Sequence, residues 1–467
     1  MRNIFSILFI LASLVGFSQK INREMAMGVA NEFIQQNLMN CLVASVEPYT
    51  SSTGDTMYFI VQAEPHQYVI VAADQRVQPV LAWSNTSQFD SQQPFAEILE
   101  ADINNRLTAF EHYNTEQKTN IKFQWIRFID GLTPIAKYQV WPPAGSTSTG
   151  GWIETHWTQS APYNQFCPMD PVTSTRSYTG CPATAMAQII NYLKTTQNTR
   201  FDDADDYHHN YAGRNYYIDD DWDSLSFLSF PDLNAWLDSI DILYQSGTDA
   251  SGASAAALTF ACGTACVQVY TSAGSGTFSV NQAYTAYQRF GFVNSQLLTT
   301  TDSIMYNMLI DNMKLGYPAH LAVVDSAWSV GHNVVVDGYN TDGYFHINFG
   351  WGGSNDGWWL VPDPSFPYSM GVLEGIVLNI IPVSASIEEN EKDAASLFFP
   401  NPAKNEVFFE NTANETVQYQ IFNISGQLVK TGFSNGSIEI SELPAGAFEI
   451  KLSSNSIQCS EKIVIVK

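Results

Sequence analysis

The sequence predicts an α+β protein built from three successive folded parts. Its 467 residues exceed what one hydrophobic core usually serves, and the 45% content of hydrophobic residues excludes a disordered chain. Along the chain, the spacing of apolar residues changes from helix and strand, to helices followed by strands, to strands alone. We therefore expect an N-terminal α+β unit, a central mixed unit and a C-terminal all-β sandwich.

The N-terminus has the features of a signal peptide. A basic residue, Arg2, precedes an apolar run at residues 4–15, and small residues stand three and one positions before a cut after Ser18. The run is too short to cross a bilayer. We expect the protein to be secreted or at the cell surface, with no membrane span.

Changes in composition set the expected domain boundaries. The stretch 142–151 is rich in Pro, Gly and Ser/Thr and predicts an exposed linker, whereas the stretch 386–393 is charged. Helical spacing at residues 23–38 and alternating strands at 57–62 and 67–72 define the first unit. The predicted parts are 1–18 (signal peptide), 19–140 (N-terminal unit), 141–383 (central unit), 384–395 (linker) and 396–467 (β-sandwich).

Charge and cysteine content exclude several classes of partner. With 46 acidic against 21 basic side chains, the surface repels phosphate backbones and anionic lipid, so nucleic acid is not expected as a ligand. If Cys181 is reserved for chemistry, the other five cysteines cannot all pair, so no disulfide framework holds the fold. Cys262 and Cys266 lack a second matching pair and are interpreted as packed side chains rather than metal ligands.

Two further motifs are discounted as ligand sites. The aspartates at residues 202–206 and 219–221, with His208 and His209, match no EF-hand spacing and predict a solvated acidic insertion. The glycine-rich stretch 350–357 lacks the lysine of a P-loop. We predict no cofactor and no metal.

Cys181 is predicted to begin a helix. Pro182 fits the first turn, and Ala183, Met186 and Ile190 continue an apolar stripe. At this position the helix dipole favours the thiolate, and first-turn amides can bind an oxyanion. The alternative is a buried structural cysteine at a helix start.

His332 lies on a predicted strand, residues 331–339, that is expected to pair with residues 344–349. With the loop centred on Asn340, Asn348 would lie opposite His332 and fix its tautomer, while Trp351 would shield their hydrogen bond. A lone histidine in an apolar strand is also often a core residue, which is the interpretation given to His346.

The order Cys181, His332, Asn348, Trp351 is papain-like. The segment at residues 157–164 adds Gln159, whose amide is a candidate second donor to the oxyanion. The alternative for Gln159 is an ordinary polar residue in a loop.

These motifs resemble the streptopain family of cysteine peptidases. The resemblance rests on Gly180-Cys181 with residues 183–188, Gly331-His332 with Asp337-Gly338, and residues 346–353, while residues 67–74 and 79–84 resemble the family's inhibitory propeptide. It implies a papain-like catalytic domain with Cys181 as nucleophile, His332 as base, Asn348 and Trp351 at matching positions, and a prodomain removed on activation. Phe349 and Pro182 depart from streptopain itself.

The C-terminal segment resembles the sorting domains of type IX secretion in Bacteroidetes, through residues 397–403, 424–427, 443–446 and Lys467. The alternative is an adhesive or carbohydrate-binding β-sandwich. The expected function is a secreted cysteine endopeptidase made as a zymogen. Its expected partners are protein or peptide substrates, its own prodomain as inhibitor, and the secretion machinery. A catalytically inactive surface adhesin and a non-protein amidase or acyltransferase are the alternatives.

Overall fold

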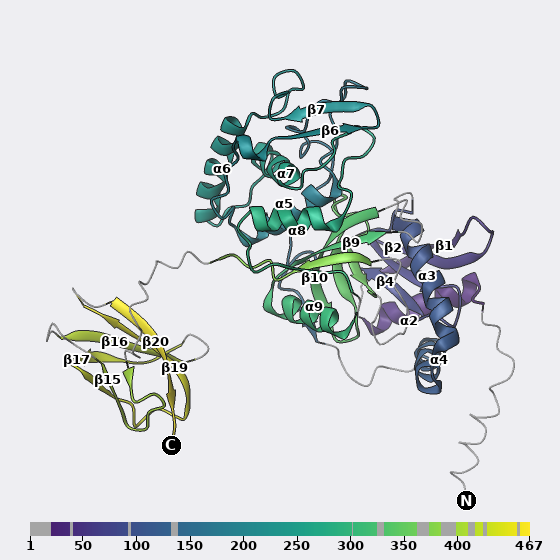
Figure 1. The fold of residues 1–467 in the computed structure, drawn as a ribbon. Coiled ribbons are helices and arrows are strands. Elements are labelled where there is room, and N and C mark those ends of the chain that lie inside the picture. The colour runs from purple at the N-terminus through teal and green to yellow at the C-terminus, as the bar shows by residue number, and fades with distance from the viewer. Residues whose placement is uncertain are drawn as a thin grey trace, which may run out of the picture. The chain divides into compact units, whose positions relative to one another are not determined.

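The computed structural model describes residues 20–37, 41–91, 95–131, 139–300, 302–324, 331–361, 373–383, 398–409, 416–423, 427–454 and 458–467. The predicted signal peptide, residues 1–18, and the predicted linker, residues 384–395, lie outside these ranges. The chain divides into two compact units, Met1–Val383 and Ser384–Lys467, which are described separately (Figure 1).

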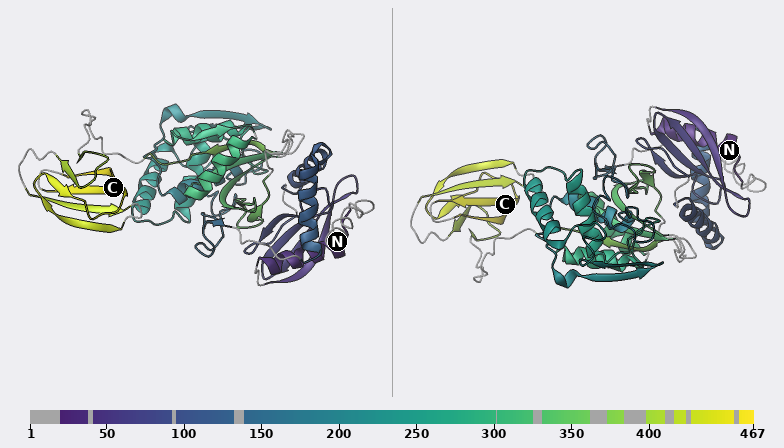
Figure 2. Two further views of the ribbon diagram at one scale, coloured as in Figure 1. Left: turned by 90° about the horizontal axis from the view of Figure 1, so that it is seen from below. Right: turned by 90° about the horizontal axis from the view of Figure 1, so that it is seen from above.

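The N-terminal part of the first unit combines helices with antiparallel strands, as predicted. Its elements are α2 (Arg23–Gln36), β1 (Leu42–Thr50), β2 (Thr56–Glu64), β3 (Gln67–Ala72), β4 (Val80–Ser84), α3 (Phe95–His112) and α4 (Thr115–Ile129). Asn22 caps α2 by accepting a hydrogen bond from the Met25 amide at 2.9 Å, which satisfies a first-turn donor. In Figure 2 the blue helices of this part lie beside its purple strands.

The central part begins with a short strand and alternates helices with strands. Its elements are β5 (Val140–Trp141), α5 (Cys181–Leu193), η1 (Asp203–Asp205), β6 (Tyr207–Tyr211), β7 (Arg214–Ile218), α6 (Phe230–Gln245), α7 (Ala253–Ala265), α8 (Val280–Arg289), β8 (Gln296–Leu298), α9 (Ser303–Leu315), β9 (Ala319–Val324), β10 (Gly331–Asn340), β11 (Phe345–Asn348), β12 (Gly357–Trp359) and β13 (Leu373–Leu378). Helices dominate before Ala319 and strands after it, as the sequence predicted.

One sheet runs through both parts of this unit. Its strand order is β1-β2-β3-β4-β12-β11-β10-β9-β13-β8, and β5 pairs with β10. The junction is the antiparallel pairing of β4 with β12, in which Trp83 lies opposite Trp358 and the two indoles stack at 5.8 Å. The N-terminal part is thus joined to the central part by backbone hydrogen bonds.

Strand β10 separates two hydrophobic cores, because alternate residues of a strand point to opposite faces. Val334 and Val336 belong to a core that includes α9 and the N-terminal strands. Val335 belongs to a second core, which includes α5, α7 and α8. Figure 1 shows α5 and α8 on one side of β9 and β10, and α9 on the other.

The predicted linker at residues 142–151 is exposed over only part of its length. Residues 143–146 are exposed, but Thr149 is 3% exposed and Gly151 is buried. A Cβ atom on Gly151 would lie 2.3 Å from Asp337 Oδ2 and from His346 Nδ1. The end of this stretch therefore packs into the central part, which a composition rich in Gly and Ser/Thr does not reveal.

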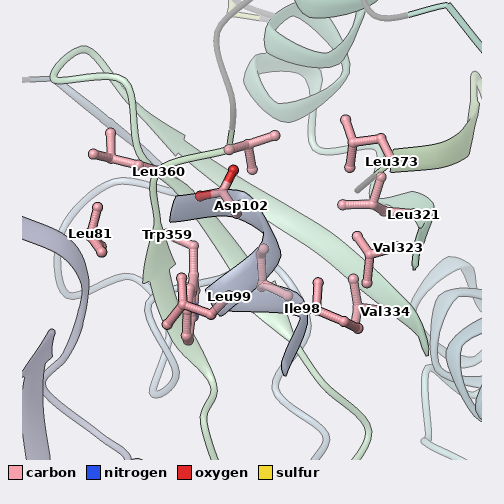
Figure 3. Close-up of a pocket in the computed structure, with 12 residues that line it drawn as sticks. Leu81, Ile98, Leu99, Asp102, Leu321, Val323, Val334, Trp359, Leu360 and Leu373 are labelled. Carbon is pink, nitrogen blue, oxygen red and sulfur yellow. The ribbon is translucent and has the colours of Figure 1, made fainter. Parts of the chain in front are cut away.

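An apolar recess lies between α3 and the shared sheet (Figure 3). Its lining is Leu81, Ile98, Leu99, Asp102, Leu321, Val323, Val334, Ile347, Trp359, Leu360, Val361 and Leu373. Burial raises the pKa of Asp102, and an ion pair with Arg106 Nε at 2.6 Å opposes this. Arg106 also donates to the Leu360 carbonyl at 2.9 Å and so ties α3 to the chain after β12.

The C-terminal unit consists of two antiparallel sheets. One contains β14 (Phe398–Phe399), β15 (Glu406–Phe409) and β18 (Ser437–Glu439), and the other β16 (Val417–Asn423), β17 (Leu428–Ser434), β19 (Gly446–Ser453) and β20 (Gln458–Ile465). Phe398 and Val407 from the first sheet share a core with Ile421 and Ile450 from the second. The predicted all-β sandwich is confirmed. Within the described ranges of the whole chain, no helix is long and apolar enough to cross a membrane.

Candidate active site

Cys181 is the first residue of α5, as predicted. Its N-cap is Gly180, with φ of 83°, and Pro182 occupies the first turn. A Cβ on Gly180 would lie 2.6 Å from the Oε1 of Gln268, so both the backbone conformation and the space require glycine. Cys181 thus lies at the positive end of the helix dipole, a position that favours a thiolate or an oxyanion.

Among the described residues, the side chain that hydrogen-bonds to the Cys181 thiol is that of Asn333. The Nδ2 atom of Asn333 lies 3.8 Å from Sγ and donates to it. Desolvation raises the pKa of the Cys181 thiol, whereas hydrogen bonds from the Asn333 backbone and side chain oppose that rise. Burial is the largest cause, so the thiol form is favoured in this conformation.

His332 lies on β10 and is 4% exposed. Its Nε2 donates to the Phe349 carbonyl at 2.8 Å, which leaves Nδ1 unprotonated in the neutral ring and available as a base. The indole of Trp351 stacks on the imidazole with ring centroids 4.3 Å apart. Burial lowers the pKa of His332 to about 4, so the ring is neutral at pH 7.

The pairing predicted for the His332 hairpin is wrong. Asn348 lies opposite Val335, and Tyr339 lies opposite Phe345, with a bulge between Val336 and Gly338. The turn is centred further along the chain than Asn340, because Gly343 supplies a φ of 88° and the Asn340 side chain accepts from the amides of residues 342 and 344. The carbonyl of Phe349, rather than the Asn348 amide, is therefore the acceptor that orients His332.

Asn348 instead contacts helix α5. Its Oδ1 accepts from Gln188 Nε2 at 3.1 Å, and its Nδ2 donates to the Thr155 carbonyl at 2.9 Å. The fully buried Gln188 also accepts from the Trp157 amide at 3.1 Å. These bonds join the helix that begins at Cys181 to strand β11 and to residues 155–157.

Cys181 and His332 lie on opposite faces of strand β10. Asn333 points to the face that carries α5, so its neighbour His332 points to the other face. On that face lies the core that includes the N-terminal part, to which Phe349 belongs and against which Trp351 packs. Among the described contacts of these two residues, none joins the thiol to the imidazole. The structure thus brings together His332 with Trp351, and the Cys181 helix with Asn348, as two separate groups.

Gln159 is held close to the start of α5 through its backbone. Its carbonyl accepts from the amide of Thr179, two residues before Cys181, at 2.9 Å. The residue is half-buried, in a turn region. This position is compatible with a donor to an oxyanion at Cys181.

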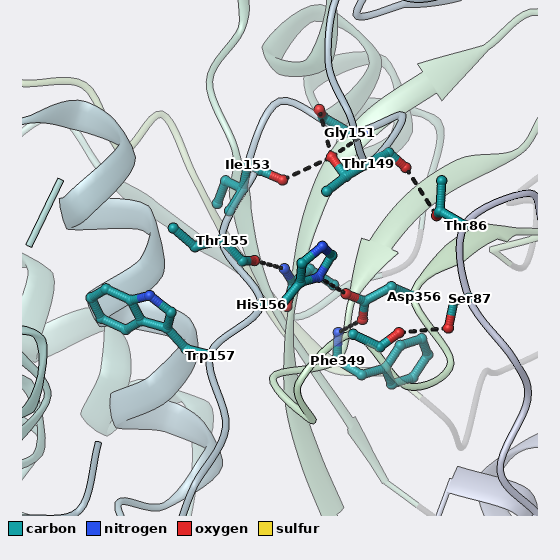
Figure 4. Close-up of polar contacts among 12 residues, drawn as sticks. Thr86, Ser87, Thr149, Gly151, Ile153, Thr155, His156, Trp157, Phe349 and Asp356 are labelled. Carbon is teal, nitrogen blue, oxygen red and sulfur yellow. Dashed lines mark hydrogen bonds and ion pairs between the residues drawn. The ribbon is translucent and has the colours of Figure 1, made fainter. Parts of the chain in front are cut away.

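A buried carboxylate behind His332 was not singled out from the sequence. Asp356 is 2% exposed, accepts from the Phe349 amide at 2.8 Å and contacts His156 Nδ1 at 3.2 Å (Figure 4). The hydrogen bond that His156 donates to Asp356 raises the pKa of His156 despite partial burial. Asp356 thereby fixes the peptide whose carbonyl orients His332. Its position seven residues after Phe349, in a glycine-rich loop, carries no periodic signal.

The N-terminal part contacts this same loop directly. The hydroxyl of Tyr68 donates to the Asn355 carbonyl at 2.7 Å, and the Asn355 amide donates to the Gln88 carbonyl at 3.1 Å. Ser87 Oγ donates to the Gly353 carbonyl at 2.5 Å, as Figure 4 shows beside Asp356. The chain that follows Trp351 is therefore bound by residues 68–88.

The discounted residues have structural partners. Cys262 and Cys266 are fully buried, and His346 is buried with its Nδ1 2.6 Å from Asp337 Oδ1. In the acidic insertion, Asp205 forms an ion pair with Arg289, at the turn before the hairpin of β6 and β7. Cys41, Cys167, Cys181, Cys262 and Cys266 are free thiols. Within the described ranges, no three His, Cys, Asp or Glu side chains form a metal-ligand group.

Comparison with known families decides the relationship of the central part. The model of the Peptidase C10 family matches residues 157–359, a range that includes Cys181, His332, Asn348, Trp351 and Gln159. Residues 157–359 form a Peptidase C10 domain. The resemblance to the streptopain family is thereby confirmed.

Two further models match the segments on either side of the C10 domain. The Spi protease inhibitor matches residues 18–103, and the secretion system C-terminal sorting domain matches residues 397–466. The sorting domain indicates export by type IX secretion, to the cell surface or beyond it, as the sequence predicted.

Individual relatives are distant. Thiol protease/hemagglutinin PrtT of Porphyromonas gingivalis is 23% identical over 327 residues, which cover 65% of this chain and 33% of PrtT. The chain thus spans about a third of that relative's length. A fragment of Prevotella intermedia prointerpain A is 21% identical and covers 72% of this chain and 98% of its own, with a TM-score of 0.46. Active interpain A of the same organism is 24% identical. The match covers 50% of this chain and 94% of the interpain A chain, with a TM-score of 0.37.

Proposed function

We propose that this protein is a secreted cysteine endopeptidase made as a zymogen, with Cys181 as nucleophile and His332 as general base. The observation that carries the proposal is the position of Cys181. It opens α5 inside a Peptidase C10 domain, directly after a glycine whose positive φ would strain a larger residue. The inhibitor-type N-terminal segment and the sorting domain supply the expected inhibitor and the expected route of export.

The reaction uses groups already present at the site. Nδ1 of His332 takes the thiol proton, and Sγ of Cys181 attacks the peptide carbonyl carbon. First-turn amides of α5, with Gln159 as a second donor, stabilise the oxyanion. The amine then leaves with the proton held by His332, and a thioester remains. Water, deprotonated by the same ring, attacks the thioester and restores the thiol.

His332 has to move before it can act in this way. In the resting chain the ring lies on the face of β10 that is covered in part by the N-terminal segment, and Trp351 and Phe349 hold it there. We therefore assign residues 19–140 as the inhibitory prodomain and residues 141–383 as the catalytic domain. The activation cut is placed in the exposed residues 143–146. In the active form, Asn348 and Trp351 position the base.

Proteolytic assays test this function. Purified proprotein is incubated with casein and with fluorogenic peptides under reducing conditions, and intact mass is followed in parallel. We expect hydrolysis to rise as an N-terminal fragment is lost. Cys181→Ala and His332→Ala should abolish both, whereas Cys262→Ala, a matched change at another thiol, should retain both.

Two results would contradict the proposal. The first is a wild-type chain that stays inactive on all peptides after its N-terminal segment has been cut off near residue 145. The second is a Cys181→Ala protein that hydrolyses peptides at the wild-type rate. Either outcome would favour an adhesin or a non-peptide acyl-transfer enzyme.

A further inference from the structure

A chain of three side chains, from α8, β9 and β10, leads to the Cys181 thiol. Tyr287 on α8 contacts His320 Nδ1 at 3.1 Å, and His320 Nε2 contacts Asn333 Oδ1 at 2.8 Å. Asn333 Nδ2 then donates to Cys181 Sγ at 3.8 Å. We call Tyr287, His320 and Asn333 the Asn333 network. No step of the proposed reaction uses it.

The donors in this network have one consistent direction. Because the Asn333 oxygen can only accept, His320 carries its proton on Nε2, and its Nδ1 accepts from the Tyr287 hydroxyl. Tyr287 and His320 are both fully buried, and desolvation lowers the pKa of His320 to about 4, so the ring is neutral at pH 7. The amide of Asn333 is thereby fixed with its NH₂ group toward sulfur.

The Asn333 network and the candidate base His332 depend on opposite faces of the same strand. Asn333 and His332 are adjacent on β10, so only one of them faces Cys181 at a time. Turning His332 toward the thiol takes Asn333 away from Sγ and from His320. The buried Nε2 proton of His320 then loses its acceptor, which is unfavourable in an apolar interior.

We propose that Tyr287, His320 and Asn333 are positioning residues that hold Cys181 in its resting state and oppose the approach of His332. This inference rests on the proposed function of Cys181 and His332 and names a regulatory device within the catalytic domain itself. It acts in addition to the prodomain, because all three residues lie outside residues 19–140. Its loss should therefore show in the intact, uncut chain.

The test measures the reactivity of Cys181 in the uncut chain. Iodoacetamide is added to the full-length protein at pH values from 5 to 9, and alkylation of the Cys181 peptide in the uncut species is quantified by mass spectrometry. A thiol alone reacts more slowly as pH falls, whereas a thiolate paired with a protonated histidine keeps a plateau of reactivity at acidic pH. The plateau is a signature that a merely structural residue would not change.

We expect Asn333→Ala to show this plateau and to react about tenfold faster than wild type at pH 6, which corresponds to about 1.4 kcal/mol. Tyr287→Phe, which leaves His320 in place, should give a smaller rise of about twofold, as expected for an indirect hydrogen bond. Asn312→Ala and Tyr244→Phe remove a buried amide and a buried hydroxyl elsewhere in the same unit, and should leave the profile unchanged.

Other outcomes overturn the inference. An unchanged profile in Asn333→Ala would show that the network does not restrain the base. Slower alkylation of Cys181 in Asn333→Ala, with a single titration of the thiol at higher pH than in wild type, would show that Asn333 only solvates the sulfur. Since alkylation needs no substrate, it tests the Asn333 network independently of the proposed peptidase activity. A plateau in Asn333→Ala without peptide hydrolysis removes the proposed peptidase activity alone, whereas wild-type hydrolysis with no plateau in that variant removes the network alone.

Discussion

The two faces of strand β10 hold the two halves of the candidate dyad in different surroundings. On one face, His332 stacks on Trp351 in a core that includes the N-terminal strands and α3. On the other, Cys181 begins α5, whose apolar residues lie in a second core that has no member before Ile153. Removing the prodomain therefore dismantles part of the first core and leaves the second intact. We therefore expect the surroundings of His332, rather than those of Cys181, to change when the N-terminal segment is removed.

The largest effect expected of a single substitution comes from the N-terminal side of this comparison. Arg106→Ala leaves the buried carboxylate of Asp102 without its partner, and breaking such a pair costs about 4 kcal/mol. Denaturant unfolding of the full chain, in a Cys181→Ala background, measures the loss. The double variant Asp102→Leu/Arg106→Met, which replaces the pair by apolar groups, should recover most of it. Equal losses in both variants would contradict this account of the pair.

Acid should destabilise both faces, because each contains a buried histidine. The pKa of His320 and of His332 is lowered to about 4 from an ordinary value of 6.5, so the unfolded chain binds more protons between these values. Stability should fall as pH decreases from about 6.5 to 4, by about 3 kcal/mol for each ring. Denaturant midpoints across this range measure the slope.

Substitutions of the two histidines test whether they cause the fall in stability at acidic pH. His332→Ala and His320→Ala should each flatten the slope by about half, while the exposed His208→Ala should leave it unchanged. A wild-type slope in both buried-site variants would show that other groups control the acid response.

Gly180→Ala should act on the nucleophile side alone. The added Cβ would meet Gln268 and force a residue with φ of 83° into strain, at a cost of about 2 kcal/mol. We expect slower alkylation of Cys181 and weaker peptidase activity, with normal binding of the prodomain. The exposed Gly247→Ala, which also has a positive φ but an open surrounding, is the matched control. Equal effects of Gly180→Ala and the control variant would contradict the steric explanation.

The smallest effect is expected for Trp351→Leu, which removes the ring that stacks on His332. Such an aromatic contact contributes about 1 kcal/mol. Thermal unfolding should show a small loss of stability, together with lower peptidase activity, since Trp351 positions the ring of His332 in the proposed active form. Trp222→Leu, at an exposed indole in the same unit, should change neither quantity.

The sequence was informative where local rules decide the structure. Cys181 begins a helix because Pro182 belongs in a first turn and an apolar stripe follows, and the structure has that helix. The hairpin was mispredicted because the bulge at Asp337 and the turn at Gly343 shift the register, and a shift of one residue exchanges the faces of a strand. For the same reason, the contact of Asn333 with Cys181 was not predictable.

The pairing of β4 with β12 joins segments that are far apart along the chain. Trp83 lies opposite Trp358, 275 positions later (358 minus 83). Sheets that depend on such distant pairings close slowly, because a long loop must be ordered before the strands can meet. Until residues 357–359 have been synthesised, β4 has an apolar edge with no partner on that side. In the interval between synthesis of these two strands, the unpaired edge of β4 therefore exposes this chain to aggregation.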